Sequence, residues 1–141
     1  MGFFSIPMAR MTGPRGNVIC IDVQKKMLGY LGKRAQKAGV SAVMNYRLCS
    51  EDSLGIDDLA GTIDFLLLFA VLHEIPNRES LFVQINRALR RGGRVLFAEP
   101  EGHVKRNDFD ASVAMALRNG FTVAGHPQPI WRSHAILLEK K

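Results

Sequence analysis

The sequence predicts an α/β protein with a doubly wound, mostly parallel sheet, helices on both faces and a C-terminal antiparallel hairpin. Three observations lead to this fold class. The apolar run in residues 63–76, IDFLLLFAVLHEIP, is typical of a strand buried on both faces of a parallel sheet. Strand-like and helix-like segments alternate along the chain. The last two strand candidates have no helix between them, which favours an antiparallel pair.

The first part of the chain predicts a helix, a strand and a second helix. Apolar residues at helical spacing cover residues 3–11, and the β-branched run 18–23 predicts a buried strand. In residues 24–38 the apolar positions share one face and lysines lie opposite, so this segment predicts an amphipathic helix, with Gly39 closing it.

The second part continues the alternation around the central apolar strand. A helix is expected after Pro76, stopped by Gly92 and Gly93, with Arg90 and Arg91 in its last turn where the helix dipole favours cations. A strand is expected before the central one, over residues 42–46. After the helix we expect a strand over 94–98, a helix over 109–117 and the two closing strands over 121–124 and 133–139.

Length and composition favour one ordinary globular domain over residues 1–141. The hydrophobic share is 47% and the charged share 23%. Lys and Arg number 19 against 13 Asp and Glu, but the charges are spread over several elements. A nucleic-acid site is not indicated, because the densest cluster, in residues 25–37, holds one aromatic, Tyr30. The apolar run is too short for a membrane span.

The two cysteines of the chain indicate in which cellular compartment the protein resides. Cys20 and Cys49 form neither a metal-ligand spacing nor a disulfide framework, and each lies in or beside a predicted strand. We expect buried, reduced thiols and a cytoplasmic protein.

Asp22 is the first candidate for a functional residue. A carboxylate at the end of a buried strand, beside a topological switch point, is well placed to accept both hydroxyls of a ribose. The same residue type also caps helices well, and a helix is predicted to begin near Gln24. The sequence leaves both roles open, and they do not exclude each other.

Polar residues follow two predicted strands that we expect to be neighbours. His73 and Glu74 follow the central strand, and Glu99 and His103 follow the next one. Either histidine could act as a general base. The four side chains are also possible metal ligands by type, or simply cap and loop residues on a solvated rim. We assign no metal site.

The order of these features resembles the class I S-adenosylmethionine-dependent methyltransferases, the small seven-stranded kind. This resemblance implies a Rossmann-like fold and transfer of a methyl group from S-adenosylmethionine to an acceptor, expected to be a small molecule. The segments that carry it are residues 2–5, 17–23, 50–54, 63–74, 89–94 and 120–121.

The resemblance also implies roles for individual residues. Asp22 would hold the ribose of the cofactor and Val23 would pack on its adenine. Ser50 and Glu51 occupy the loop that meets the adenine edge, although many relatives have Asp or Asn in place of Ser50. Phe69 matches the position whose backbone carbonyl receives the methionyl amino group.

The sequence departs from the family pattern at its start. The family begins with a strand that leads into a glycine-rich loop of the form Asp/Glu-x-Gly-x-Gly-x-Gly. Only Gly2 matches this loop, at its last glycine. We therefore expect an N-terminally truncated class I methyltransferase fold, a domain incomplete at its N-terminus, in preference to a deliberately reduced protein. The absent strand would lie beside residues 63–69.

Two other functions remain open from the sequence. A non-catalytic binding or scaffold protein could keep this fold without the cofactor loop. A nicotinamide-dependent oxidoreductase also fits, because a glycine about 20 residues ahead of a strand-end acid occurs in that pattern. The antiparallel closing hairpin and the pair His73 and Glu74 favour the methyltransferase.

Overall fold

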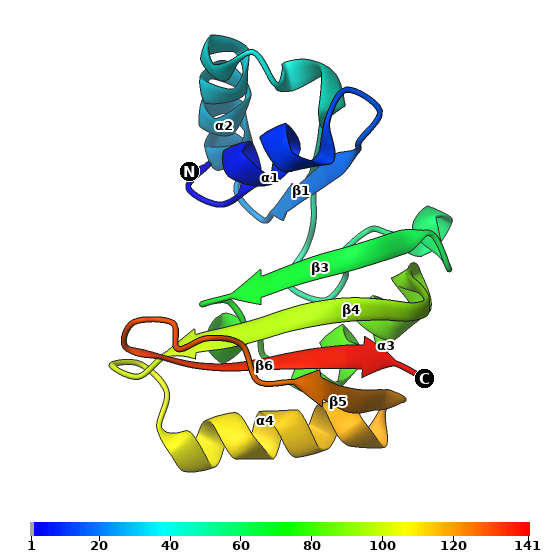
Figure 1. Cartoon of the computed structure of the whole chain (residues 1–141), viewed down its shortest axis with the longest axis vertical. Helices are drawn as coiled ribbons and strands as arrows, with labels where there is room; N and C mark the ends of the chain where they lie inside the picture. The colour runs from blue at the N-terminus through cyan, green and yellow to red at the C-terminus, as the bar shows by residue number, and fades with distance from the viewer. Residues whose placement is uncertain (1) are drawn as a thin grey trace. The chain divides into compact units, whose positions relative to one another are not determined.

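The computed structural model describes residues 2–141. The chain divides into two compact units, Met1–Gly55 and Ile56–Lys141, here called unit 1 and unit 2. Each has its own sheet and its own packed helices (Figure 1).

Unit 1 contains a parallel two-stranded sheet with two helices packed against it. Its β-strands run side by side, with Val18 opposite Met44 and Asp22 opposite Leu48. Buried apolar side chains from both strands and both helices form one core cluster. The elements are α1 (Ser5–Thr12), β1 (Val18–Asp22), α2 (Lys25–Ala38), the 3₁₀ turn η1 (Ser41–Val43) and β2 (Met44–Leu48).

The helix α2 forms as its amphipathic pattern predicts. Leu28, Leu31 and Ala35 are its buried residues, and they lie on one face because they are three and four positions apart. Gly39 has φ 73° and donates its N–H to the carbonyls of Ala35 and Gln36. A glycine suits this left-handed cap because it has no Cβ to clash.

Unit 2 contains a mixed four-stranded sheet in the order β3-β4-β6-β5 (Figure 1). The strands β3 and β4 are parallel, and β6 is antiparallel to both β4 and β5. The α/β class and the C-terminal antiparallel pair are therefore confirmed. The elements are η2 (Asp57–Leu59), β3 (Ile63–Phe69), η3 (Leu72–Glu74), α3 (Arg78–Ala88), β4 (Leu89–Pro100), α4 (Arg106–Arg118), β5 (Phe121–Gly125) and β6 (Ser133–Lys140).

Four phenylalanines form the centre of the core of unit 2. The Phe97 ring of β4 stacks on Phe109 of α4 at 4.8 Å and meets Phe82 of α3 edge-on at 6.0 Å. Phe82 also contacts Phe121 of β5 at 6.2 Å. Because Phe97 touches both helices, α3 and α4 pack on the same face of this sheet. Full burial of each ring contributes about 1.5–3 kcal/mol.

The predicted end of helix α3 is wrong. The helix ends at Ala88, Arg87 is the basic residue of its last turn, and Arg90 and Arg91 lie inside β4. The cause is tertiary: Leu89 already pairs with Ile63 of β3. Helical spacing within the segment does not contain this information.

The predicted position of β2 is shifted, and the central strand is less enclosed than expected. The strand β2 is Met44–Leu48, because residues 41–43 form a 3₁₀ turn instead of a strand. In β3 only Leu68 is buried, and Phe65 is 44% exposed. These exposures show that the predicted burial on both faces is wrong, and β3 is also an edge strand of the four-stranded sheet. Among residues 2–141, we find no helix with the length and apolar character needed to cross a membrane.

Candidate functional site

The carboxyl ends of β1 and β2 bring together most of the residues expected to bind a cofactor. The parallel register places Asp22 beside Leu48, so the segments that follow both strands start at the same edge. The backbone N–H of Cys49 donates to the carbonyl of Asp22 at 3.0 Å. This bond holds the loop that contains Ser50 and Glu51 next to the turn that contains Val23.

The Asp22 side chain orders the turn between β1 and α2. Its Oδ1 atom accepts the backbone N–H of Gln24 at 2.8 Å. Gln24 is the N-cap of α2, so Asp22 lies before the cap and does not bind the first free N–H groups of the helix. A carboxylate has about four acceptor positions, so this one bond leaves capacity for ribose hydroxyls.

Val23, Ser50 and Glu51, which lie near Asp22, differ in exposure and in hydrogen bonding. Val23 is 51% exposed, which is unusual for a valine directly after a core strand and suits an apolar contact. The Ser50 hydroxyl accepts the backbone N–H of Ser53 at 3.1 Å, and the Ser50 N–H donates to the Ser53 carbonyl at 3.1 Å. Ser50 therefore closes its own loop, while Glu51 beside it is exposed.

Gly2 begins the chain segment that leads into α1. Its φ is 87°, and an added Cβ would lie 2.8 Å from the Cδ1 atom of Ile6. The left-handed conformation favours glycine here, whereas the Ile6 side chain could move to relieve the close contact. This fits the close backbone approach that the family resemblance implies for the position.

Phe69 is the last residue of β3 and belongs to unit 2. The residue after it, Ala70, has φ 58°, and its N–H donates to the carbonyl of Ala98 at 2.9 Å. A non-glycine residue in the left-handed region is uncommon and often occurs at functional turns. No pattern in the sequence indicates this strained turn.

Burial and charge alter the two thiols of unit 1. Burial raises the pKa of Cys49, and the nearby Asp22 carboxylate raises that pKa further. Burial also raises the pKa of Cys20, an effect that a hydrogen bond with Ser5 partly offsets. Both cysteines are free and only partly buried, so the expectation of buried thiols is wrong and that of reduced thiols stays a prediction.

His73 and Glu99 form a hydrogen-bonded pair at the ends of the neighbouring strands β3 and β4. The Glu99 Oε2 atom lies 2.6 Å from His73 Nδ1, and Oε1 accepts the His73 backbone N–H at 3.2 Å. Glu99 is only 1% exposed. The predicted proximity of these two strand ends is correct, and the buried carboxylate fixes both the ring and the backbone of His73.

The Glu99 contact decides how the His73 ring can act. If Glu99 is ionised, it accepts the proton of Nδ1–H, and the lone pair of the neutral ring then lies on Nε2. The Nε2 atom is 3.9 Å from Oε1 of Glu74, which is largely exposed. The His103 ring stacks on His73 at 5.5 Å, with 10° between the planes. Glu99 and His103 together fix the orientation of the His73 ring.

Sequence reasoning considered Glu99 as a metal ligand or as a residue of a solvated rim, and it missed both the burial of Glu99 and its role as the partner of His73. The strand-end position of the acid was visible, but the pairing depends on the register of β3 and β4. Among residues 2–141, no group of three or more His, Cys, Asp or Glu side chains is placed to hold a metal ion.

Comparison with known protein families identifies the family of this chain. Residues 1–97 match a family described as a methyltransferase domain. The chain belongs to this family. The resemblance seen in the sequence is thereby confirmed.

Two curated relatives illustrate the similarity. The Ubiquinone/menaquinone biosynthesis C-methyltransferase UbiE of Pasteurella multocida is 28% identical over 98 residues, which are 70% of this chain and 36% of that protein. The Demethylmenaquinone methyltransferase of Lactobacillus johnsonii is 27% identical over 94 residues, covering 67% of this chain and 38% of the relative. The chain thus spans well under half the length of either relative.

Solved structures share the fold of this methyltransferase-family chain. A SAM dependent methyltransferase from Aquifex aeolicus superposes with a TM-score of 0.84 at 17% identity, covering 99% of this chain and 77% of that one. The [4+2]-cyclase SpnF superposes with a TM-score of 0.73 at 17% identity, covering 88% of this chain and 49% of that one. At these identities the likeness establishes the fold alone.

Proposed function

We propose that this chain binds S-adenosylmethionine and takes part in methyl transfer to a small-molecule acceptor. The observation that carries the proposal is the gathering of Asp22, Val23 and the loop of Ser50 and Glu51 at the carboxyl ends of β1 and β2. Ligands in open α/β sheets bind at this edge. The chain's membership of the methyltransferase family supports the same function.

Each cofactor-site residue has a chemical role in this proposal. Asp22 accepts the ribose hydroxyls, and the exposed Val23 side chain packs on the adenine. Ser50 and Glu51 line the adenine edge. Gly2 gives backbone access. Phe69 belongs to unit 2, and its role stays the one that the family resemblance implies. The cofactor supplies a methyl group on a positively charged sulfur.

His73 is the proposed general base on the acceptor side. Its Nε2 lone pair accepts a proton from the acceptor, while Glu99 holds the ring and balances the positive charge that His73 then carries. The names of the curated relatives suggest a quinone precursor as acceptor, and a phenolic hydroxyl is a group that such a base deprotonates. His103 stacks on His73 and is the second candidate base.

We also propose a cytoplasmic location. The two free cysteines support it, because exported proteins commonly oxidise such residues.

Calorimetric titration with S-adenosylhomocysteine tests cofactor binding. We expect binding of this compound and none of NADH. Asp22→Ala should weaken binding about 10- to 100-fold, because charge-assisted hydrogen bonds contribute about 1.5–3 kcal/mol. Asp108→Ala, which removes an exposed carboxylate from unit 2, is the matched control and should bind normally. Binding of NADH alone would overturn the proposal.

Transfer of labelled methyl groups to a panel of reduced quinone precursors tests the acceptor side. His73→Gln should slow transfer about 10²- to 10⁴-fold with unchanged cofactor binding, because general-base catalysis has this magnitude. His126→Gln, at an exposed loop position, is the control. An active His73→Gln protein would remove His73 from the mechanism without affecting the cofactor site.

A further inference from the structure

The exposed face of α2 carries a row of lysines with one tyrosine among them. Lys26, Tyr30, Lys33 and Lys37 follow one another at spacings of four, three and four residues, so they form one stripe along the helix. The stripe is about 16 Å long, from a rise of about 1.5 Å per residue. Lys25 and Arg34 flank it, and α2 contains no acidic residue.

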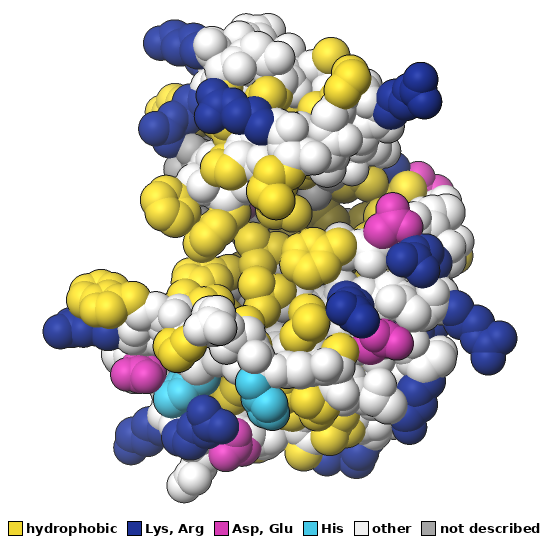
Figure 2. All heavy atoms as spheres, viewed as in Figure 1, with side chains coloured by type: hydrophobic (Ala, Val, Ile, Leu, Met, Phe, Trp, Pro, Cys, Tyr) yellow, Lys and Arg dark blue, Asp and Glu magenta, His cyan; other side chains and the backbone are white. Residues whose placement is uncertain are grey.

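Among the described residues, the lysines of this stripe have no acidic partner, unlike several arginines of unit 2. In unit 2, Arg90 pairs with Asp64 at 2.8 Å, and Arg94 pairs with Glu139 at 3.0 Å. Within the described residues 2–141, none of the lysines of α2 forms an ion pair. On the face drawn in Figure 2, unit 1 carries basic side chains and unit 2 carries both acidic and basic ones.

The charge imbalance belongs to unit 1 as a whole. Residues 1–55 contain eight Lys and Arg against three Asp and Glu, whereas residues 56–141 contain eleven against ten. Lysines cost free energy to hold close together without counter-charges, so an anionic surface that covers the stripe lowers the energy of the assembly.

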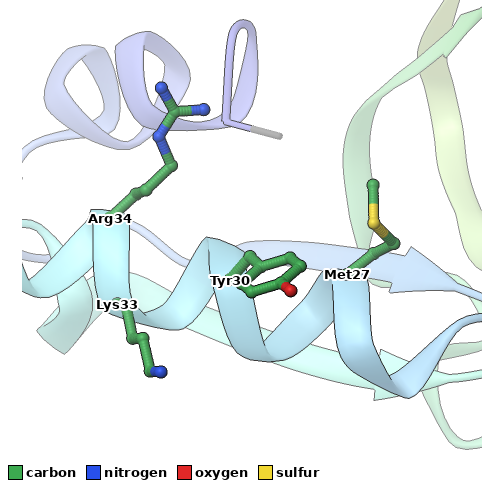
Figure 3. A pocket seen from close by; sticks show the side chains of 4 residues that line it. All are labelled: Met27, Tyr30, Lys33 and Arg34. Carbon is green, nitrogen blue, oxygen red and sulfur yellow. The ribbon is translucent and has the colours of Figure 1, made fainter.

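The stripe also offers an aromatic side chain and a hollow at the surface. Tyr30 is 47% exposed, and the Lys26 Nζ atom lies 5.7 Å from its ring centre. An open hollow of about 420 Å³ is lined by Met27, Tyr30, Lys33 and Arg34. Figure 3 shows Lys33 and Arg34 leaving α2 in different directions, with Tyr30 one turn away. A tyrosine among lysines is typical of groups that settle at a lipid headgroup layer.

We propose that the α2 stripe docks this protein on the surface of an anionic phospholipid bilayer. Clusters of four to eight basic residues on an amphipathic helix have this property, and attraction to anionic lipid needs only charge density near the surface. The apolar face of α2 is committed to the core of unit 1, so the contact is electrostatic and peripheral. A nucleic-acid partner fits less well, because the stripe has one aromatic and no row of base-reading side chains. The inference does not depend on the proposed methyl transfer.

Sedimentation of the full chain with lipid vesicles tests the docking. We expect binding to phosphatidylcholine vesicles that contain phosphatidylglycerol, no binding to pure phosphatidylcholine, and loss of binding as potassium chloride rises. Lys33→Gln combined with Lys37→Gln should weaken partitioning about 25-fold, since each lysine near an anionic bilayer contributes about fivefold. Lys33→Arg combined with Lys37→Arg should retain it.

A charge-matched variant separates the stripe from net charge. Lys105→Gln combined with Arg118→Gln removes two exposed cations from unit 2 and should leave vesicle binding unchanged. Equal weakening by this control would overturn the proposal, as would equal binding to pure phosphatidylcholine or no vesicle binding at all. Displacement of the protein from vesicles by equimolar duplex RNA or DNA would overturn it in favour of a nucleic-acid partner. Circular dichroism of each variant confirms that it is folded.

Discussion

At the scale of single residues, Glu99 is an acidic side chain buried from solvent. Burial of such a group without partners is strongly unfavourable. His73 supplies two partners at once, its ring N–H and its backbone N–H. The same contacts that allow Glu99 to be buried therefore fix the orientation of the proposed base.

The Glu99 contacts predict a loss of stability on substitution. Glu99→Gln should lower the free energy of unfolding by about 1.5–3 kcal/mol, because hydrogen bonds to a charged group are replaced by neutral ones. Urea denaturation followed by circular dichroism measures the change. Glu101→Gln, at an exposed position two residues later, should change it by less than about 0.5 kcal/mol. Equal stability of the two variants would show that the buried pair contributes no net stability.

The coupling between Asp22 and Cys49 predicts a change in thiol reactivity. The Asp22 carboxylate disfavours the thiolate and so raises the pKa of Cys49. Asp22→Asn should lower that pKa, so more thiolate is present and alkylation by iodoacetamide is faster at a fixed pH below 9.0, the usual thiol value. Mass spectrometry of the two cysteine peptides gives both rates.

Cys20 is the internal control in the same experiment. Burial raises the pKa of Cys20, and Asp22 is not among the causes. Its alkylation rate should not change in the Asp22→Asn protein. An unchanged Cys49 rate, with both thiols still accessible to the reagent, would contradict the coupling.

At the scale of elements, the helix α3 depends on its N-cap. The Asn77 side chain accepts the backbone N–H of Ser80 at 3.0 Å, which satisfies a donor that has no partner within the helix. Asn77→Ala should lower the free energy of unfolding by about 1 kcal/mol, whereas Asn77→Ser should preserve most of it. Thermal unfolding of the three proteins provides the measurement. A destabilised serine variant would show that Asn77 acts through something other than its cap.

At the scale of the whole molecule, each unit has a separate core. Leu31 lies in the core of unit 1, and Phe97 lies at the centre of the aromatic core of unit 2. Truncation of such side chains to alanine costs about 2–5 kcal/mol. Cavities weaken the structure first around themselves, so their effects should differ along the chain.

Hydrogen exchange with peptide-level mass spectrometry tests this separation. Leu31→Ala should reduce amide protection chiefly in peptides from residues 1–55, and Phe97→Ala chiefly in peptides from residues 56–141. Val83→Ala in α3, where the side chain is 40% exposed, is a milder control for unit 2. Uniform loss of protection along the chain in both core variants would show that the two cores unfold as one.

Much of the fold was accessible from local patterns. The one-sided apolar spacing of α2 and its glycine stop were sufficient to predict that helix, and Asp22 could be placed at a strand end from the β-branched run before it. These features depend on neighbours in the sequence. The boundary between α3 and β4 was missed because Leu89 pairs with Ile63, a residue far away in the chain.

The sequence by itself determined the α/β class, the methyltransferase family and the identity of the candidate residues, because side-chain periodicity and residue type suffice for these. Only the tertiary structure decided which residues meet. The parallel register of β1 and β2 brings Asp22 beside the loop of Ser50, and that of β3 and β4 brings Glu99 onto His73. Which strands pair depends on segments that are distant in the sequence, so the pattern within one segment does not contain this information.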